Sequence, residues 1–202
     1  MLKVGLTGSI AVGKSFVLSV LAELGCVTFD ADLIAHQVME PGREAHRKIV
    51  EEFGPDVLKP GGSIDRARLG AIVFVEAEKR RRLNEIVHPS VIEEQNRLLL
   101  EAEARRPDGI AVVDAALMIE SGGYKRFDKL IVAYCDRETQ IARLMHRAEI
   151  SRQEAEMRLG AQMSSDEKRR YADYEVDTSG SFEQTRSQVE SIHRKLLDSS
   201  NN

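Results

Sequence analysis

The sequence has no tryptophan, and aromatic residues make up only 5% of its 202 residues. Proteins that bind single-stranded nucleic acid stack the bases on aromatic rings, so this kind of partner is not expected. The 29 basic residues are outnumbered by 33 acidic ones, for a formal net charge of −4. The overall charge therefore does not suggest a nucleic-acid partner either.

Cysteine and long apolar runs are also scarce. Cys26 and Cys135 both lie beside apolar segments, which favours two buried free thiols over a disulfide. No stretch approaches the roughly 18 apolar residues of a membrane span, the N-terminal residues lack the pattern of a signal peptide, and no Cys/His cluster suits zinc. These absences predict a soluble cytoplasmic protein that has no membrane partner.

Residues 8–15 read Gly-Ser-Ile-Ala-Val-Gly-Lys-Ser and match the phosphate-loop pattern G-x-x-x-x-G-K-[ST]. In such a loop the backbone N–H groups and the start of the following helix surround phosphate oxygens. Lys14 can reach the β- and γ-phosphates, and the Ser15 hydroxyl can ligate Mg²⁺. An apolar strand candidate precedes the loop and an apolar helix candidate follows it, which favours a phosphate site over an ordinary glycine-containing turn. The candidate ATP contacts are Gly8, Ala11, Val12, Gly13, Lys14, Ser15 and, through its backbone N–H alone, Phe16.

Five strand candidates alternate with helical patterns along the chain, at residues 2–7, 26–29, 110–114, 129–134 and 174–177. This order predicts an α/β fold with a parallel sheet flanked by helices, of the P-loop NTPase type. We expect a single domain, with a core at about 1–35, 108–143 and 172–202. An inserted helical substrate lobe would cover about 36–107, with helices that break at His88-Pro89, and a basic lid would cover about 144–171. The tail, 181–198, predicts an amphipathic helix that opens with a capping box and has Phe182, Val189, Ile192 and Leu196 on its apolar side.

Three aspartates follow predicted strands, where ligands bind in folds of this type. Asp30 and Asp32 end the second strand, and either could accept a proton from an attacking hydroxyl or merely cap a helix. We favour Asp30 as the cap and Asp32 as the base. Asp114 ends the third strand and is a candidate for holding Mg²⁺ or its water shell.

Gln140, Arg143 and Arg147 share one face of a predicted helix, because they are spaced at i, i+3 and i+7. Arginine matches the geometry of phosphate oxygens, so this face could carry the positive charge that phosphoryl transfer needs, although a solvated basic face would look the same. His36 and His88 could reach an anionic substrate or could be structural.

These motifs, taken in order, resemble the dephospho-coenzyme A kinase family over nearly the whole chain. The likeness runs from Gly5-Leu6-Thr7-Gly8 and Asp30-Ala31-Asp32 through His88-Pro89 and Val113-Asp114 to Ala172-Asp173-Tyr174. The resemblance implies transfer of the γ-phosphate of ATP to the ribose 3′-hydroxyl of dephospho-CoA. It further implies Asp32 as the base, Lys14 and Arg143 as ligands of the transferring phosphate, and Ser15 as a ligand of Mg²⁺.

Three other readings share parts of this pattern. A nucleoside monophosphate kinase would have the same core and a different acceptor pocket. A GTPase would need an Asn-Lys-x-Asp motif, and the chain has no Asn-Lys pair. A binding module without catalytic activity would not need an aspartate, a lysine and an arginine for phosphoryl transfer, and this chain has candidates for all three. The sequence slightly favours a monomer and leaves the oligomeric state open.

Overall fold

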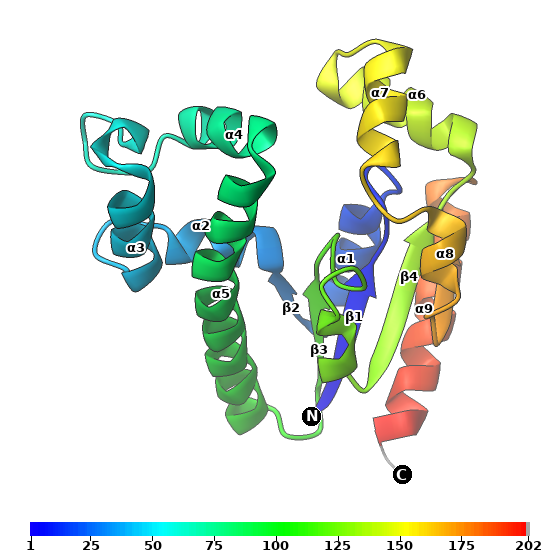
Figure 1. Ribbon diagram of the computed structural model, residues 1–202. Helices are drawn as coiled ribbons and strands as arrows, with labels where there is room; N and C mark the ends of the chain where they lie inside the picture. The colour runs from blue at the N-terminus through cyan, green and yellow to red at the C-terminus, as the bar shows by residue number, and fades with distance from the viewer. Residues whose placement is uncertain (201–202) are drawn as a thin grey trace. The chain divides into compact units, whose positions relative to one another are not determined.

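The computed structural model describes residues 1–200, and its centre is a parallel sheet of five strands in the order β2-β3-β1-β4-β5 (Figure 1). The strands are β1 (Leu2–Thr7), β2 (Val27–Asp30), β3 (Ile110–Asp114), β4 (Lys129–Tyr134) and β5 (Tyr174–Asp177). Each lies within one residue of its predicted position, so the predicted fold class is confirmed. β1 pairs with β3 on one side and with β4 on the other. The carboxyl ends of these three strands therefore lie side by side at one edge of the sheet.

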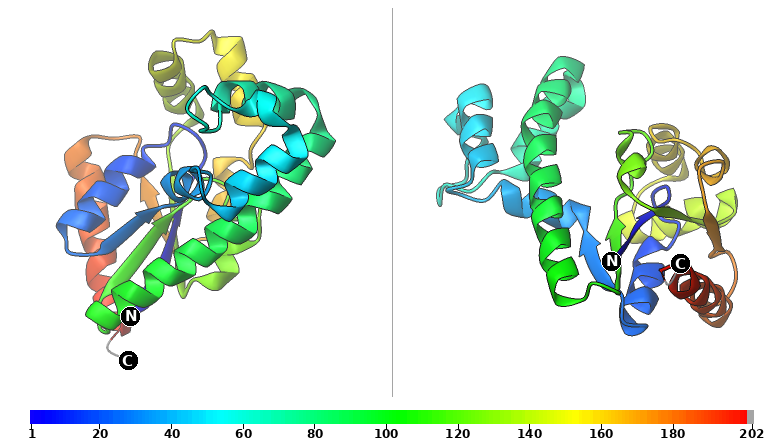
Figure 2. Two further views of the ribbon diagram at one scale, coloured as in Figure 1. Left: turned by 90° about the vertical axis from the view of Figure 1, so that its left-hand side faces the viewer. Right: turned by 90° about the horizontal axis from the view of Figure 1, so that it is seen from below.

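Burial on both faces explains why the strands are nearly continuous apolar runs. All five residues of β3 are buried, as are four of the six in β4. The largest buried cluster joins the central strands to one face of α1 (Lys14–Glu23) and α9 (Phe182–Ser200). Those two helices pack against each other on one face of the sheet, while the short α8 (Ser165–Arg169) lies against β4 on the opposite face (Figure 2). The remaining helices of this unit are η2 (Gly123–Arg126), α6 (Arg137–Ala148) and α7 (Arg152–Gly160).

The chain forms two compact units, one of residues 1–29 with 102–200 and one of residues 30–101. The second unit is helical and contains α2 (Ala31–Val38), α3 (Glu44–Phe53), η1 (Pro55–Val57), α4 (Arg66–Val75) and most of α5 (Ala77–Arg105). An isolated bridge between Leu58 and Ile64 closes the turn that leads from η1 to α4. This unit buries Ile34, Val38, Ala45 and Ile49.

One sequence prediction about helices is wrong, and one apolar residue of the last helix lies outside the core. The expected break at His88-Pro89 does not occur, because Pro89 lies inside the continuous helix α5. Proline removes only one backbone hydrogen bond, and this 29-residue helix has turns on both sides of it. Phe182 is 72% exposed and does not join the core, although Val189, Ile192 and Leu196 do. Phe182 begins α9, and its ring instead lies 4.8 Å from that of Phe16.

The predicted capping box of the last helix is confirmed. The Ser181 N–H donates to Gln184 Oε1 at 2.9 Å, and the Gln184 N–H donates back to Ser181 Oγ at 3.3 Å. Within residues 1–200, none of the helices has the length and apolar character needed to cross a lipid bilayer.

Candidate active site

The loop between β1 and α1 has the backbone geometry of a phosphate cradle. Gly8 allows a close approach, because a Cβ there would lie 2.4 Å from the Ala133 carbonyl oxygen. Gly13, at φ 84°, supplies the left-handed residue from which α1 begins. No side chain caps this helix, so none competes with an anion at its N-terminus, although the Phe16 N–H already donates to the Gly13 carbonyl at 3.1 Å. The side chain of Val12 packs in the hydrophobic core, so it does not project into the phosphate site.

Lys14 and Asp114 come together at the mouth of the loop. The Lys14 ammonium lies 3.1 Å from one oxygen of Asp114 and 3.4 Å from the other. Their side chains are only 16% and 10% exposed, so water screens this pair weakly. The sequence placed both residues near the phosphates, and the parallel pairing of β1 with β3 brings them into contact.

Arg143 reaches the loop from α6 and is held by Thr178. Its guanidinium donates to the Thr178 hydroxyl at 3.2 Å and to the Thr178 carbonyl at 2.7 Å. The Thr178 hydroxyl in turn donates to the Val12 carbonyl at 2.6 Å. The residue after β5 therefore fixes both the arginine and the loop, a role that the sequence pattern does not predict.

The second unit carries the other candidate residues, beginning with the two aspartates after β2. The Asp30 carboxylate accepts hydrogen bonds from the N–H groups of Asp32 and Leu33, at 2.8 and 3.1 Å, so it is the N-cap of α2. This confirms the structural role that the sequence favoured for Asp30. Asp32 is exposed in the first turn of α2, with His36 one turn further on. His36 lies 3.5 Å from the guanidinium of Arg66, which the sequence analysis did not single out.

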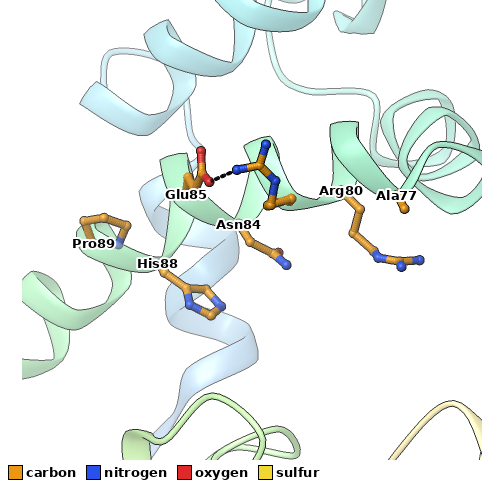
Figure 3. Close-up of a pocket in the computed structure, with 7 residues that line it drawn as sticks. Ala77, Arg80, Asn84, Glu85, His88 and Pro89 are labelled. Atoms are coloured by element: carbon orange, nitrogen blue, oxygen red, sulfur yellow. Dashed lines mark hydrogen bonds and ion pairs between the residues drawn. The ribbon is translucent and has the colours of Figure 1, made fainter.

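His88 is exposed on α5 and lines a surface pocket of about 560 Å³. Figure 3 shows that Arg80, Asn84 and His88 extend from the same side of the helix, as their spacing of four residues requires. Glu85 is turned away and pairs with Arg81 at 2.8 Å. The pocket thus presents a cation, an amide and an imidazole, a set that suits a polar or anionic ligand.

The expected basic character of the lid is partly neutralised within the chain. Arg152 forms ion pairs with Glu138 and Glu156, at 2.7 and 2.9 Å, and Arg169 pairs with Glu175 at 2.7 Å. Arg147 is exposed and makes no ion pair within residues 1–200. Among the basic residues of α6 to α8 that the sequence grouped together, Arg147 is therefore better placed to meet a ligand than Arg152 or Arg169.

Lys168 belongs to the predicted basic lid, but its side chain is completely buried. Its ammonium donates to the Ala116 carbonyl at 2.7 Å and lies 2.8 Å from the Glu120 carboxylate. Burial lowers the pKa of Lys168, while the bond to Glu120 opposes that shift. In the sequence it stands in a run of three basic residues, and nothing there distinguishes it from its exposed neighbour Arg170.

Ser15 and Asp114 are the residues that fit a magnesium ion. Within the described part of the chain, no three His, Cys, Asp or Glu side chains gather into a metal cluster. Magnesium bound with a nucleotide needs few protein ligands, because phosphate oxygens and water complete its coordination. One exposed hydroxyl at the start of α1 and one carboxylate beside Lys14 meet that requirement.

A parallel sheet, a glycine loop that runs into an uncapped helix, and a lysine beside a strand-end aspartate define a P-loop kinase. The sequence profile of the dephospho-CoA kinase family matches residues 2–184. The chain belongs to that family.

Similar proteins cover nearly the full length of the chain. It is 48% identical over 200 residues to a dephospho-CoA kinase of Geobacter metallireducens, a match that covers 98% of each chain. The solved structure of dephospho-CoA kinase from Campylobacter jejuni is 28% identical, has a TM-score of 0.75 and matches over 98% of each chain. A shikimate kinase from Acinetobacter baumannii, at 17% identity and a TM-score of 0.54, shares the fold alone.

Proposed function

We propose that this chain transfers the γ-phosphate of ATP to the ribose 3′-hydroxyl of dephospho-CoA, the last step of coenzyme A biosynthesis. The contact of Lys14 with Asp114 beside the glycine loop carries the proposal, since it gathers the groups that phosphoryl transfer needs at one point. Membership of the dephospho-CoA kinase family supports the choice of acceptor.

The phosphate side of the reaction would rest on fixed positive charge. Lys14 would bind the β- and γ-phosphates, and Arg143 would stabilise the charge that spreads over the transferring group. Both side chains are held by other residues of the chain, Lys14 by Asp114 and Arg143 by Thr178. Preorganised charge of this kind acts without reorganisation at the moment of reaction.

Asp32 would accept the proton from the attacking hydroxyl. Two observations support this role: its carboxylate is exposed, and Asp30 already serves as the cap of α2. His36 and His88 would bind the anionic part of the acceptor in the helical unit, and Arg147 would contact it from the end of α6. The neighbours Arg66 and Arg80 add positive charge near the two histidines.

Magnesium would be held by Ser15 and, directly or through water, by Asp114. When bound, the ion supplies positive charge at the β- and γ-phosphate oxygens. The contact with Asp114 would then keep the Lys14 ammonium beside the same phosphates. A cytoplasmic site of action is part of the proposal and is supported by the two buried free thiols, Cys26 and Cys135.

The decisive experiment incubates the purified protein with ATP and dephospho-CoA and follows coenzyme A by mass spectrometry. Adenosine monophosphate, cytidine monophosphate and shikimate serve as competing acceptors, because kinases of this fold differ mainly in the acceptor pocket. We expect product with dephospho-CoA and none above background with the other three. Faster transfer to a nucleoside monophosphate would refute the proposed acceptor while leaving the kinase assignment intact.

A further inference from the structure

The phosphate loop contains one strained residue. Ala11 has φ 61°, a left-handed conformation that a residue with a Cβ adopts reluctantly. Apart from Glu149 at the end of α6, it is the one non-glycine residue with positive φ in the described chain. A conformation of this kind persists only when the surroundings enforce it.

Side chains from other segments hold both neighbours of Ala11. The Ile10 N–H donates to Gln162 Oε1 at 2.9 Å, and Gln140 Nε2 donates to the Ile10 carbonyl at 2.6 Å. On the other side, the Thr178 hydroxyl donates to the Val12 carbonyl. The peptide group between Ile10 and Ala11 is thus held at its carbonyl, and the peptide groups before Ile10 and after Val12 are also fixed from outside the loop.

Gln162 follows α7, and its own position is well anchored. The next residue, Met163, accepts a hydrogen bond from Ser9 Oγ at 2.8 Å through its carbonyl and donates its N–H to Glu120 at 3.2 Å. Glu120 is held by the buried ammonium of Lys168. The segment after α7 is therefore tied to the loop at Ser9 and Ile10, and to the rest of the unit through a buried ion pair.

We propose that Gln162 and Gln140 are positioning residues that clamp the strained turn at Ala11 and so keep the phosphate loop in the conformation that binds ATP. The inference rests on the proposed role of the loop as the ATP site. Neither glutamine has to touch the nucleotide, because each acts on the peptide groups of Ile10. The helical spacing groups Gln140 with the phosphate-binding arginines, but it is 6% exposed and its amide donates to the loop carbonyl of Ile10.

The clamp explains how the loop tolerates alanine where glycine would be free of strain. Without the two glutamines, Ala11 would relax toward ordinary backbone angles, and only a fraction of the molecules would present the loop correctly. The apparent affinity for ATP falls in proportion to that fraction. Glycine at position 11 occupies the left-handed region readily, so it would make the loop less dependent on the clamp.

The test measures ATP binding by titration, together with the KM values for ATP and dephospho-CoA, in Gln162→Leu. We expect ATP binding to weaken on the order of tenfold, the equivalent of one lost buried hydrogen bond, with the KM for dephospho-CoA within about twofold of the original. Gln188→Leu is the matched control. The Gln188 side chain hydrogen-bonds to a backbone as Gln162 does, in this case that of Asp177 at 2.9 and 2.8 Å, but it does not contact the loop. Its substitution should leave ATP binding unchanged.

The strain is tested by repeating Gln162→Leu in an Ala11→Gly background, where the loss should shrink to about twofold. The clamp is refuted if Gln162→Leu binds ATP normally, if it weakens both substrates alike, or if the loss stays tenfold with glycine at position 11. Failure of the starting protein to bind ATP at all would instead refute the proposed function. The two failures are therefore distinguishable.

Discussion

Replacing Lys168 by methionine should destabilise the sheet-containing unit by about 2–3 kcal/mol. Removing one partner of a buried ion pair costs roughly 3–5 kcal/mol, because the other charge is left without compensation. Glu120 is 25% exposed, so water can partly rehydrate its carboxylate, and we take a value below that range. Methionine keeps the apolar stem of the lysine, which isolates the loss of the charge and of the hydrogen bond to the Ala116 carbonyl.

Amide hydrogen exchange of β1 measures this loss, because β1 lies in the same compact unit as the pair. A change of 2–3 kcal/mol corresponds to exchange that is about 30- to 150-fold faster. Arg152→Met is the control, since Arg152 pairs with Glu138 at 2.7 Å but the two side chains are 53% and 70% exposed. Exposed pairs contribute less than about 1 kcal/mol. If both variants change exchange by the same small factor, burial adds nothing to the Lys168 pair and the reasoning fails.

Four further predictions concern the site and the thiols. Lys14→Ala should lower turnover by about 10²–10³ with the fold intact, as steady-state kinetics and circular dichroism would show, and near-normal turnover would remove Lys14 from the site. Asp32→Asn should lower turnover by about 10² while ATP binding stays within a few-fold, whereas Asp30→Asn should mainly reduce stability through the weakened cap, and the reverse pattern would exchange their roles. Hydrogen exchange in the lid, residues 144–171, should slow when ATP and dephospho-CoA are added together, as expected of a lid that excludes water, and unchanged exchange would argue against closure. Burial raises the pKa of Cys26 to about 11, so roughly one thiol in a thousand is ionised at pH 8 and alkylation followed by mass spectrometry should be slow, rising about tenfold per pH unit. Because this pKa lies above the ordinary value of 9.0, the contribution of Cys26 to stability should be complete below pH 9 and lost as the pH rises toward 11.

The sequence predicted the sheet well, because its signals are local. Buried parallel strands are short apolar runs, and the glycine-lysine-serine loop marks where the first of them ends. Asp30 could be assigned as a cap because it directly precedes a helical pattern. The same local reasoning failed at Pro89, where a single helix-breaking residue was outweighed by the turns on both sides.

The contacts that hold the loop could not be predicted, because they join residues far apart in the chain. Gln162 lies 152 residues from Ile10, and Lys168 lies 48 residues from Glu120. Lys168 and Arg170 look alike in the sequence, and only the packing of α8 against β4 buries one of them. Thr178 could have been suspected, because residues that follow a parallel strand gather at the ligand-binding edge of the sheet.

The contacts that hold the phosphate loop determine when this loop can form during synthesis on the ribosome. Residues 8–15 are made early, but the side chains that hold them come from positions 140, 162 and 178. The pairing of strand β1 is also delayed, because both of its partners, β3 and β4, are synthesised more than 100 residues later. At about 5–20 residues per second, the loop exists for roughly 10–30 s before Thr178 is added. The nascent chain therefore cannot complete its nucleotide site until Thr178 has been added, and strand β1 needs protection from wrong pairings until its partners have been made.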